Sequence, residues 1–313
     1  MMLPRYDDVL AAADRIRAHV HRTPVFTSAY FDDSTGSTVF FKAENLQKVG
    51  AFKARGATNA VLSLTEEEAG FGIVTHSSGN HGQAVAYAGR IRHVPVTVVM
   101  PHHAPAVKVE AVEGYGAEVV FCEQSARERT LSELQATSGA TIVHPFDDAA
   151  VIAGQGTVAL EFIDQVPGLD VIIAPIGGGG LLSGTSLVGE VEGVDVVGAE
   201  PETVDDSFRS LRDGVRYPAT GHRSVGDGLL TGIGALPFAV LTAASRTVLT
   251  VSDEQMLAAT RLIAIRMKLL IEPSAGAAIA ALLRYSVQFR GQRIGVVLSG
   301  GNVRLASLGD EPV

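Results

Sequence analysis

The stretch Val171-Ile-Ile-Ala-Pro-Ile-Gly-Gly-Gly-Gly-Leu-Leu-Ser-Gly184 decides the fold of this chain of 313 residues. Its first four residues form an apolar run of the length of a buried strand, and residues 181–188 predict a helix. A run of glycines connects the two. A strand, a glycine turn and a helix in this order make up one unit of an α/β fold.

The same alternation of strand-like and helix-like runs continues on both sides of this stretch. Strands are expected at residues 38–43, 72–75, 96–100, 118–121, 171–174, 194–198 and 293–298. Helices are expected at residues 6–20, 82–91, 106–115, 125–135, 156–165, 253–270 and 276–284. This alternation predicts an α/β protein with mostly parallel sheets.

The glycine run is a candidate phosphate site, and it consists of Gly177, Gly178, Gly179 and Gly180. Without side chains, backbone amides can converge on an anion, and the start of the following helix favours negative charge. Two common phosphate motifs do not fit. A G-x-G-x-x-G motif needs glycine or alanine at Leu182 or Ser183, and a P-loop needs lysine where Thr185 stands. The alternative is a tight structural turn.

A lysine among small residues lies in the run Ala51-Phe52-Lys53-Ala54-Arg55-Gly56-Ala57. Burial would lower the pKa of the Lys53 amine, which makes it a candidate for a Schiff base with an aldehyde. The alternative is a surface lysine paired with an acid. Together the lysine and the glycine run indicate a cofactor that has both an aldehyde and a phosphate, which is pyridoxal phosphate (PLP).

Two further segments complete an ordered set of four motifs. They are Ser77-Ser78-Gly79-Asn80-His81-Gly82-Gln83 and Ser299-Gly300-Gly301-Asn302. With these motifs the chain resembles the serine/threonine dehydratase and serine racemase branch of the fold-type II PLP enzymes. The resemblance extends from about His21 to Asn302, which is nearly the whole chain.

The resemblance implies the tryptophan synthase beta-like fold, with two α/β domains. The large PLP-binding domain would be discontinuous and consist of residues 1–67 and 150–313. The small domain would be inserted into it at residues 68–149. The active site would lie between the two, where ligand sites often form. A single continuous α/β domain is the alternative.

The second motif suits a substrate carboxylate at the start of a helix, through the hydroxyls of Ser77 and Ser78 and nearby amides. Helix capping by either serine is the alternative. The resemblance implies that Asn80 hydrogen-bonds the phenolic oxygen of PLP. It also implies that Ser78 protonates the substrate face opposite Lys53 in racemases. We expect His81 to be structural or to orient the carboxylate rather than to act as a base.

The resemblance places Ser299 opposite the pyridine nitrogen of PLP. A neutral hydroxyl there stabilises a protonated ring less than a carboxylate would, which favours β-elimination over transamination. The alternative is a serine that merely ends the strand at 293–298. The cofactor-binding residues implied are Phe52, Lys53, Asn80, Gly177, Gly178, Gly179, Gly180, Leu181 and Ser299.

An acidic loop, Glu200-Pro201-Glu202-Thr203-Val204-Asp205-Asp206, follows an expected strand. Several acids on one loop can bind a hard divalent cation through oxygen ligands. The resemblance implies that the ligands are Glu200, Asp206 and the backbone carbonyl of Val204. The ion would be Mg²⁺, or Ca²⁺ or Mn²⁺ in its place. A solvated acidic loop is the alternative.

Arg129, on the helix expected at 125–135, matches an arginine that can reach a second substrate carboxylate in the racemase branch. Guanidinium groups pair well with carboxylates, which makes β-hydroxyaspartate a candidate substrate. A solvated helix arginine is the alternative. The expected substrate-binding residues are Ser77, Ser78, Asn80, His81 and Arg129.

The composition argues against several classes of partner and location. Hydrophobic residues make up 46% and charged residues 19%, an ordinary globular mixture. The net charge of −9 and the lack of a basic run argue against nucleic acid. Residues 171–189 are uncharged but rich in glycine, so we expect no membrane span. The single cysteine, Cys122, and the acidic N-terminus without a signal segment indicate a cytoplasmic protein.

We therefore expect a PLP-dependent ammonia-lyase that converts L-threonine or L-serine into a 2-oxo acid and ammonia. Lys53 would hold PLP and remove the Cα proton. A serine or aspartate racemase that uses Lys53 and Ser78 on opposite faces remains open. So do a hydroxyaspartate dehydratase, a β-replacement synthase and a non-catalytic binding protein. The expected partners are a small-molecule amino acid and a second copy of the chain in a homodimer.

Overall fold

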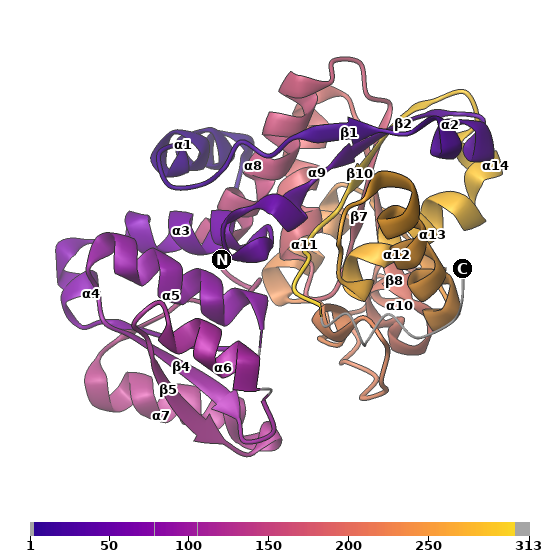
Figure 1. The fold of residues 1–313 in the computed structure, drawn as a ribbon. Helices are drawn as coiled ribbons and strands as arrows, with labels where there is room; N and C mark the ends of the chain where they lie inside the picture. Colours follow the sequence, from indigo (N-terminus) through magenta and orange to yellow (C-terminus); the bar gives the residue numbers. More distant parts are fainter. Residues whose placement is uncertain (1–2, 78, 105, 304–313) are drawn as a thin grey trace.

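The computed structural model describes residues 3–77, 79–104 and 106–303, which fold around two sheets (Figure 1). The larger sheet has six strands in the order β1-β2-β10-β7-β8-β9. These strands are β1 (Val25–Thr27), β2 (Thr38–Lys42), β7 (Val171–Pro175), β8 (Asp195–Pro201), β9 (Thr247–Val251) and β10 (Arg293–Val297). Strand β1 pairs antiparallel with β2, and the other pairings in this sheet are parallel.

The smaller sheet has four parallel strands in the order β5-β4-β3-β6. They are β3 (Ile73–His76), β4 (Val96–Pro101), β5 (Glu118–Cys122) and β6 (Thr141–Ile142). All four come between β2 and β7 in the sequence, so the smaller sheet is an insertion into the larger one. The α/β class with mostly parallel sheets is thereby confirmed. The domain bounds at residues 68–149 stay a prediction.

The helices alternate with the strands along the chain. They are α1 (Tyr6–Ile16), α2 (Ala29–Thr35), α3 (Lys53–Ser63), α4 (Glu66–Gly70), α5 (Asn80–Arg92), α6 (Ala106–Glu113), α7 (Arg127–Ser138), α8 (Ala149–Gln165), α9 (Gly180–Glu192), α10 (Asp206–Asp213), α11 (Ala235–Ala243), α12 (Asp253–Met267), α13 (Pro273–Arg284) and α14 (Ser286–Phe289). Among the described residues, none of the helices combines the length and apolarity needed to cross a bilayer.

Helices cover both faces of the larger sheet, because successive strand residues point to opposite sides. Ile173 and Val296 belong to a core that includes residues of α12 and α13. Their neighbours Ile172 and Val297 belong to a second core, with residues of α1, α8 and α9. A sheet buried on both faces explains why β7 and β10 are uninterrupted apolar runs.

Several helix ends differ from the sequence expectation for local reasons. Helix α8 begins at Ala149 rather than at 156, because the Asp148 carboxylate caps it by accepting from the Val151 amide at 2.9 Å. Helix α12 begins at Asp253 as expected, where Ser252 and Gln255 form a capping box, but it ends at Met267. The next residue, Lys268, has φ of 59°, and this left-handed conformation terminates the helix.

Candidate active site

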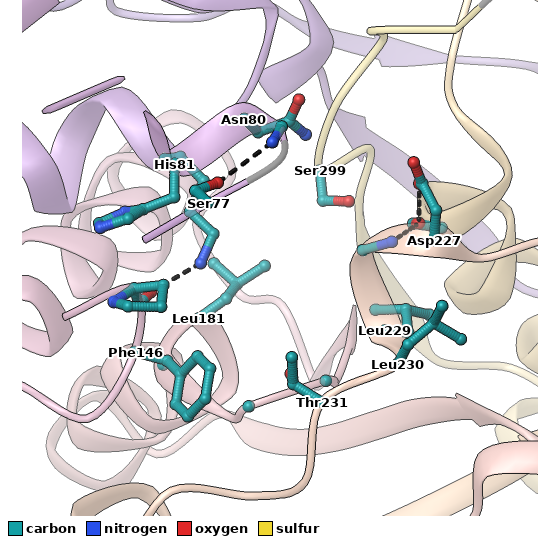
Figure 2. Close-up of a pocket in the computed structure, with 18 of the residues that line it drawn as sticks. Ser77, Asn80, His81, Phe146, Leu181, Asp227, Leu229, Leu230, Thr231 and Ser299 are labelled. Carbon is teal, nitrogen blue, oxygen red and sulfur yellow. Dashed lines mark hydrogen bonds between the residues drawn. The ribbon is translucent and has the colours of Figure 1, made fainter. Parts of the chain in front are cut away.

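One pocket of about 270 Å³ brings the four sequence motifs together (Figure 2). It is lined, among others, by Phe52, Lys53, Ser77, Asn80, His81, Gly177, Gly178, Gly179, Gly180, Leu181 and Ser299. Helices α5 and α9 begin there, directly after β3 and β7. In open parallel sheets, ligands bind at this end, outside the carboxyl ends of the strands. In Figure 2, Asn80 and His81 lie on one side of the pocket and Ser299 on the other.

Lys53 is the first residue of α3, and its half-buried side chain lines this pocket. The Nζ donates a hydrogen bond to the carbonyl oxygen of Pro145 at 2.7 Å. Burial lowers the pKa of the Lys53 amine to about 8, although the Glu272 carboxylate opposes the shift. The amine therefore loses its proton far more readily than an ordinary lysine, as nucleophilic attack on an aldehyde requires.

The glycine run offers backbone donors that the protein itself does not use. Gly177, Gly178, Gly179 and Gly180 are all buried, and their amides donate no hydrogen bond to any residue that the structure describes. Gly179 has φ of 92°, and a Cβ at Gly178 would lie 2.2 Å from the ring of Phe146. Free amides at the start of α9 fit the phosphate of PLP.

Asn80 is held by two partners from the C-terminal part of the chain. Its Nδ2 lies 3.0 Å from both carboxylate oxygens of Glu272, and its Oδ1 accepts from Asn302 at 2.8 Å. Burial raises the pKa of Glu272 to about 7, against the opposing hydrogen bond from Asn80. Glu272 belongs to none of the sequence motifs that predict the site. Its one local signal is an acid directly before Pro273, the first residue of α13.

The second motif forms the turn between β3 and α5. The Oγ of Ser77 accepts from the Gly79 amide at 3.2 Å. The Nε2 of His81 lies 3.0 Å from the carbonyl oxygen of Val143. Burial, with the charge of Lys53, holds the pKa of His81 well below its usual value, so the ring is neutral and donates to this carbonyl. Ser78 lies outside the described residues.

Ser299 is buried, follows β10 and lines the pocket. Its carbonyl oxygen accepts from the Phe52 amide at 3.0 Å, which ties the end of β10 to the residue before Lys53. Its hydroxyl makes no hydrogen bond to a described residue and is thus available to a ligand. The group that Ser299 presents to the cavity is therefore an uncharged hydroxyl.

The acidic segment lies outside this pocket and contributes two buried carboxyl groups, Glu200 near the end of β8 and Asp206 at the start of α10. Glu200 accepts from the amides of Ser207 at 3.1 Å and Phe208 at 2.8 Å. Neither carboxylate oxygen of Asp206 accepts a hydrogen bond of regular geometry from a described residue, although the Ile233 amide is close enough to oppose the rise in its pKa. Burial raises the pKa of Glu200 to about 8 and that of Asp206 to about 6. Orphaned buried carboxylate oxygens fit a cation bound between these two residues.

The structure does not bring Arg129 to the pocket. Its side chain is 76% exposed on α7, 3.6 Å from the Glu133 carboxylate four residues along. Arg127, two residues earlier, lines the pocket instead. On a helix, residues two apart point in different directions, so a match in sequence does not guarantee a match in position.

A further group of possible metal ligands consists of His76, which lines the pocket, Glu128 and His144. The Nδ1 of His144 accepts from the amides of Phe146 and Asp147. Burial also lowers the pKa of His144 to about 4, so the ring is neutral and its proton is on Nε2. Neither nitrogen then offers a free lone pair to a metal. We interpret the group as a polar contact between β3 and α7.

Comparisons with known proteins identify a family that matches nearly the whole chain. The family model "Pyridoxal-phosphate dependent enzyme" matches residues 16–300. A beta-hydroxyaspartate dehydratase of Paracoccus denitrificans is 43% identical over 312 residues, which are 98% of this chain and 99% of the relative.

Two solved structures are similar along almost their whole length. The serine racemase of Dictyostelium discoideum is 43% identical with a TM-score of 0.92, and 96% of this chain and 99% of that chain are covered. A threonine deaminase from the organism abbreviated T.th. is 40% identical with a TM-score of 0.90 and the same coverage. The chain therefore belongs to the fold-type II family of pyridoxal-phosphate dependent enzymes.

Proposed function

We propose that this protein eliminates the β-hydroxyl of a β-hydroxy amino acid as water, with L-serine and L-threonine as substrates. Hydrolysis of the released unsaturated amine then takes up one water and yields a 2-oxo acid and ammonia. The observation that carries the proposal is the buried Lys53 amine in one pocket with the free glycine amides and the neutral hydroxyl of Ser299. When bound, PLP supplies the aldehyde for a covalent link and a ring system that stabilises negative charge at the substrate Cα.

Each of these pocket residues has its own role in the proposed reaction. The Lys53 amine holds the cofactor and then accepts the Cα proton, for which a pKa near 8 is well suited. The amides at the start of α9 hold the phosphate, and those at the start of α5 receive the substrate carboxylate. Asn80, fixed by Glu272 and Asn302, orients the cofactor ring. Ser299 would offer the cofactor ring an uncharged hydroxyl rather than a carboxylate, which would favour elimination.

The test is to incubate the purified holoenzyme with L- and D-serine, L-threonine and the isomers of 3-hydroxyaspartate. Both the 2-oxo acid and the enantiomer composition are measured. We expect a 2-oxo acid and ammonia in equal amounts from the L-substrates. Absence of a 2-oxo acid from every substrate would contradict the proposal. The homodimer and the cytoplasmic location stay predictions.

Racemisation is a second candidate, favoured by the 43% identity to the Dictyostelium discoideum serine racemase. It needs a proton donor on the face opposite Lys53, and the sequence resemblance assigns this role to Ser78. Ser78→Ala should lower any racemisation of L-serine, measured by chiral chromatography, roughly 10²–10⁴-fold, the usual contribution of a positioned proton donor. Dehydration of L-serine should stay measurable. Full racemisation in Ser78→Ala would show that another group donates the proton.

The acidic loop supports a proposed divalent cation held by Glu200, Asp206 and the carbonyl oxygen of Val204. Removing the ion should leave two buried carboxylates without a counter-charge, so the melting temperature should fall in exhaustive chelator. Mg²⁺ should restore it in the wild type but not in Asp206→Asn. An identical melting temperature with and without chelator would refute the site.

The stabilisation of the protein by the proposed cation should depend on pH. Because burial raises the pKa of Glu200 to about 8, its protonated form is favoured by folding, and stability is lost as the pH rises through 8. A cation competes with that proton. The gain in melting temperature on adding Mg²⁺ should therefore be larger at pH 8 than at pH 6.

A further inference from the structure

The turn between β6 and α8, residues 144–147, supplies the hydrogen-bond acceptor of the Lys53 amine. The Nζ of Lys53 lies 2.7 Å from the carbonyl oxygen of Pro145, which is buried, and Phe146 beside it lines the pocket (Figure 2). A neutral amine that donates one hydrogen to a carbonyl keeps its lone pair free for attack on a carbon or a proton. The position of the Pro145 carbonyl therefore decides where this lone pair points inside the pocket.

Helix α11, which begins at Ala235, holds this turn in place. The Asp147 carboxylate accepts from the amide of Ala235 at 3.0 Å and from that of Leu236 at 2.7 Å. Gly234, the residue before the helix, has no side chain with which to cap it. A Cβ at Gly234 would lie 2.9 Å from the Cγ of Asp147, so the glycine leaves room for this carboxylate. Asp147 therefore caps a helix that begins 88 residues further along the chain.

The same helix start also supports the glycine run, but through different atoms. The Gly234 amide donates to the carbonyl oxygen of Gly178 at 3.0 Å. A Cβ at Gly179 would lie 2.7 Å from that of Pro237, so this backbone packs directly against α11. Neither contact involves the Asp147 side chain. The first turn of α11 is thus a common support for the candidate phosphate site and for the turn after β6, and only the support of the turn depends on Asp147.

We propose that Asp147 positions the Lys53 amine, because its carboxylate fixes the turn to α11 and so holds the Pro145 carbonyl that orients the amine. Asp147 itself lies outside the residues that line the pocket, so it acts through Pro145. The inference rests on the proposed function, since it adds a positioning residue to the same reaction. When the link to PLP forms, the amine nitrogen bonds to the aldehyde carbon, and the aldehyde oxygen leaves as water with both amine hydrogens. This step requires the lone pair of the amine to point at the aldehyde carbon.

The test compares Asp147→Ala with Asp148→Ala in the full chain freed of PLP. Asp148 is the matched control, because this neighbouring acid also caps a helix, α8, through the Val151 amide at 2.9 Å. Both variants lose a helix cap and should melt at a lower temperature than the wild type. After PLP is added, the lysine-linked absorption should appear roughly 10–10²-fold more slowly in Asp147→Ala, as expected for a misplaced reacting group, and at close to the wild-type rate in Asp148→Ala.

A conservative variant tests whether the hydrogen bonds to α11 are responsible. Asp147→Asn keeps one oxygen acceptor for the amides of α11, so its rate should fall less than that of Asp147→Ala. Equal slowing in Asp147→Ala and Asp148→Ala would overturn the inference, because loss of stability alone would then explain the slower rate. An unchanged rate in Asp147→Ala would overturn it as well.

A second probe separates the amine from the phosphate site. Pyridoxine phosphate carries an alcohol where PLP has its aldehyde, so it cannot link to Lys53. Its affinity for the chain, measured by calorimetric titration, should be the same in Asp147→Ala and the wild type, because backbone atoms connect α11 to Gly178. A parallel loss of affinity and of linking rate would overturn the role of Asp147, since the whole pocket would then be disturbed. Neither measurement requires turnover, so both hold even if no substrate is dehydrated and the proposed function fails.

Discussion

Lys53→Ala should abolish turnover and the visible absorption of the lysine-linked cofactor. The structure buries this amine in the pocket and lowers its pKa to about 8, so the same group serves as anchor and as base. Loss of a positioned base alone is worth roughly 10²–10⁴-fold in rate. Loss of the covalent link between the protein and the cofactor should lower the rate further. The measurement is 2-oxo acid release together with the absorption spectrum of the purified variant.

The matched control is Lys108→Ala, because Lys108 also lines the pocket but pairs with Asp227 at 2.8 Å. It should keep the lysine-linked absorption. Borohydride reduction and peptide mapping of the wild type should place the cofactor on Lys53. A label on Lys42, Lys48 or Lys108 would show that the anchor is misassigned.

The sequence predicted best where the determinants are local. Each of the seven expected strands forms within about three residues of its expected ends, because runs such as Val171–Pro175 are buried on both faces and stay apolar throughout. The glycine run at the start of α9 could also be predicted from the sequence as part of the site, because side chains would not fit at these positions.

Elements that depend on tertiary contacts were missed. No helix was expected after Lys53, yet α3 runs from Lys53 to Ser63. Gly56, Thr58 and Asn59 have low helix propensity, and what stabilises them is complete burial against neighbouring helices. Edge strand β9 (Thr247–Val251) was also missed, because its short mixture of threonine and apolar residues gives a weak pattern.

Site residues that act across long sequence separations could not be predicted either. Glu272 contacts Asn80 from 192 residues away, and nothing in its own segment marks it as part of the pocket. The choice between Arg127 and Arg129 depends on the rotation of α7 about its axis. A shift of two residues on a helix turns a side chain away from the cavity, and only the packing of the helix fixes that angle.

Arg55 lies two residues after Lys53, and its role likewise depends on residues far away in the sequence. The side chain is almost fully buried and forms a fork with Glu44, through Nε and Nη2, both at 2.8 Å. Its Nη1 also donates to Glu161 at 3.1 Å, and the buried amine of Lys42 donates to the same carboxylate. This network fixes the first turn of α3, on which Lys53 lies.

Arg55→Met should lower the free energy of unfolding by roughly 3–5 kcal/mol, because it leaves the buried Glu44 carboxylate without its counter-charge. That is a large share of the roughly 5–15 kcal/mol typical of a domain. The matched control, Arg22→Met, breaks an exposed pair with Asp164 and should cost at most about 1 kcal/mol. Denaturant titration of both holoenzyme variants makes the comparison. Equal midpoints would show that the buried network does not stabilise the start of α3, and that Lys53 is held in place by packing alone.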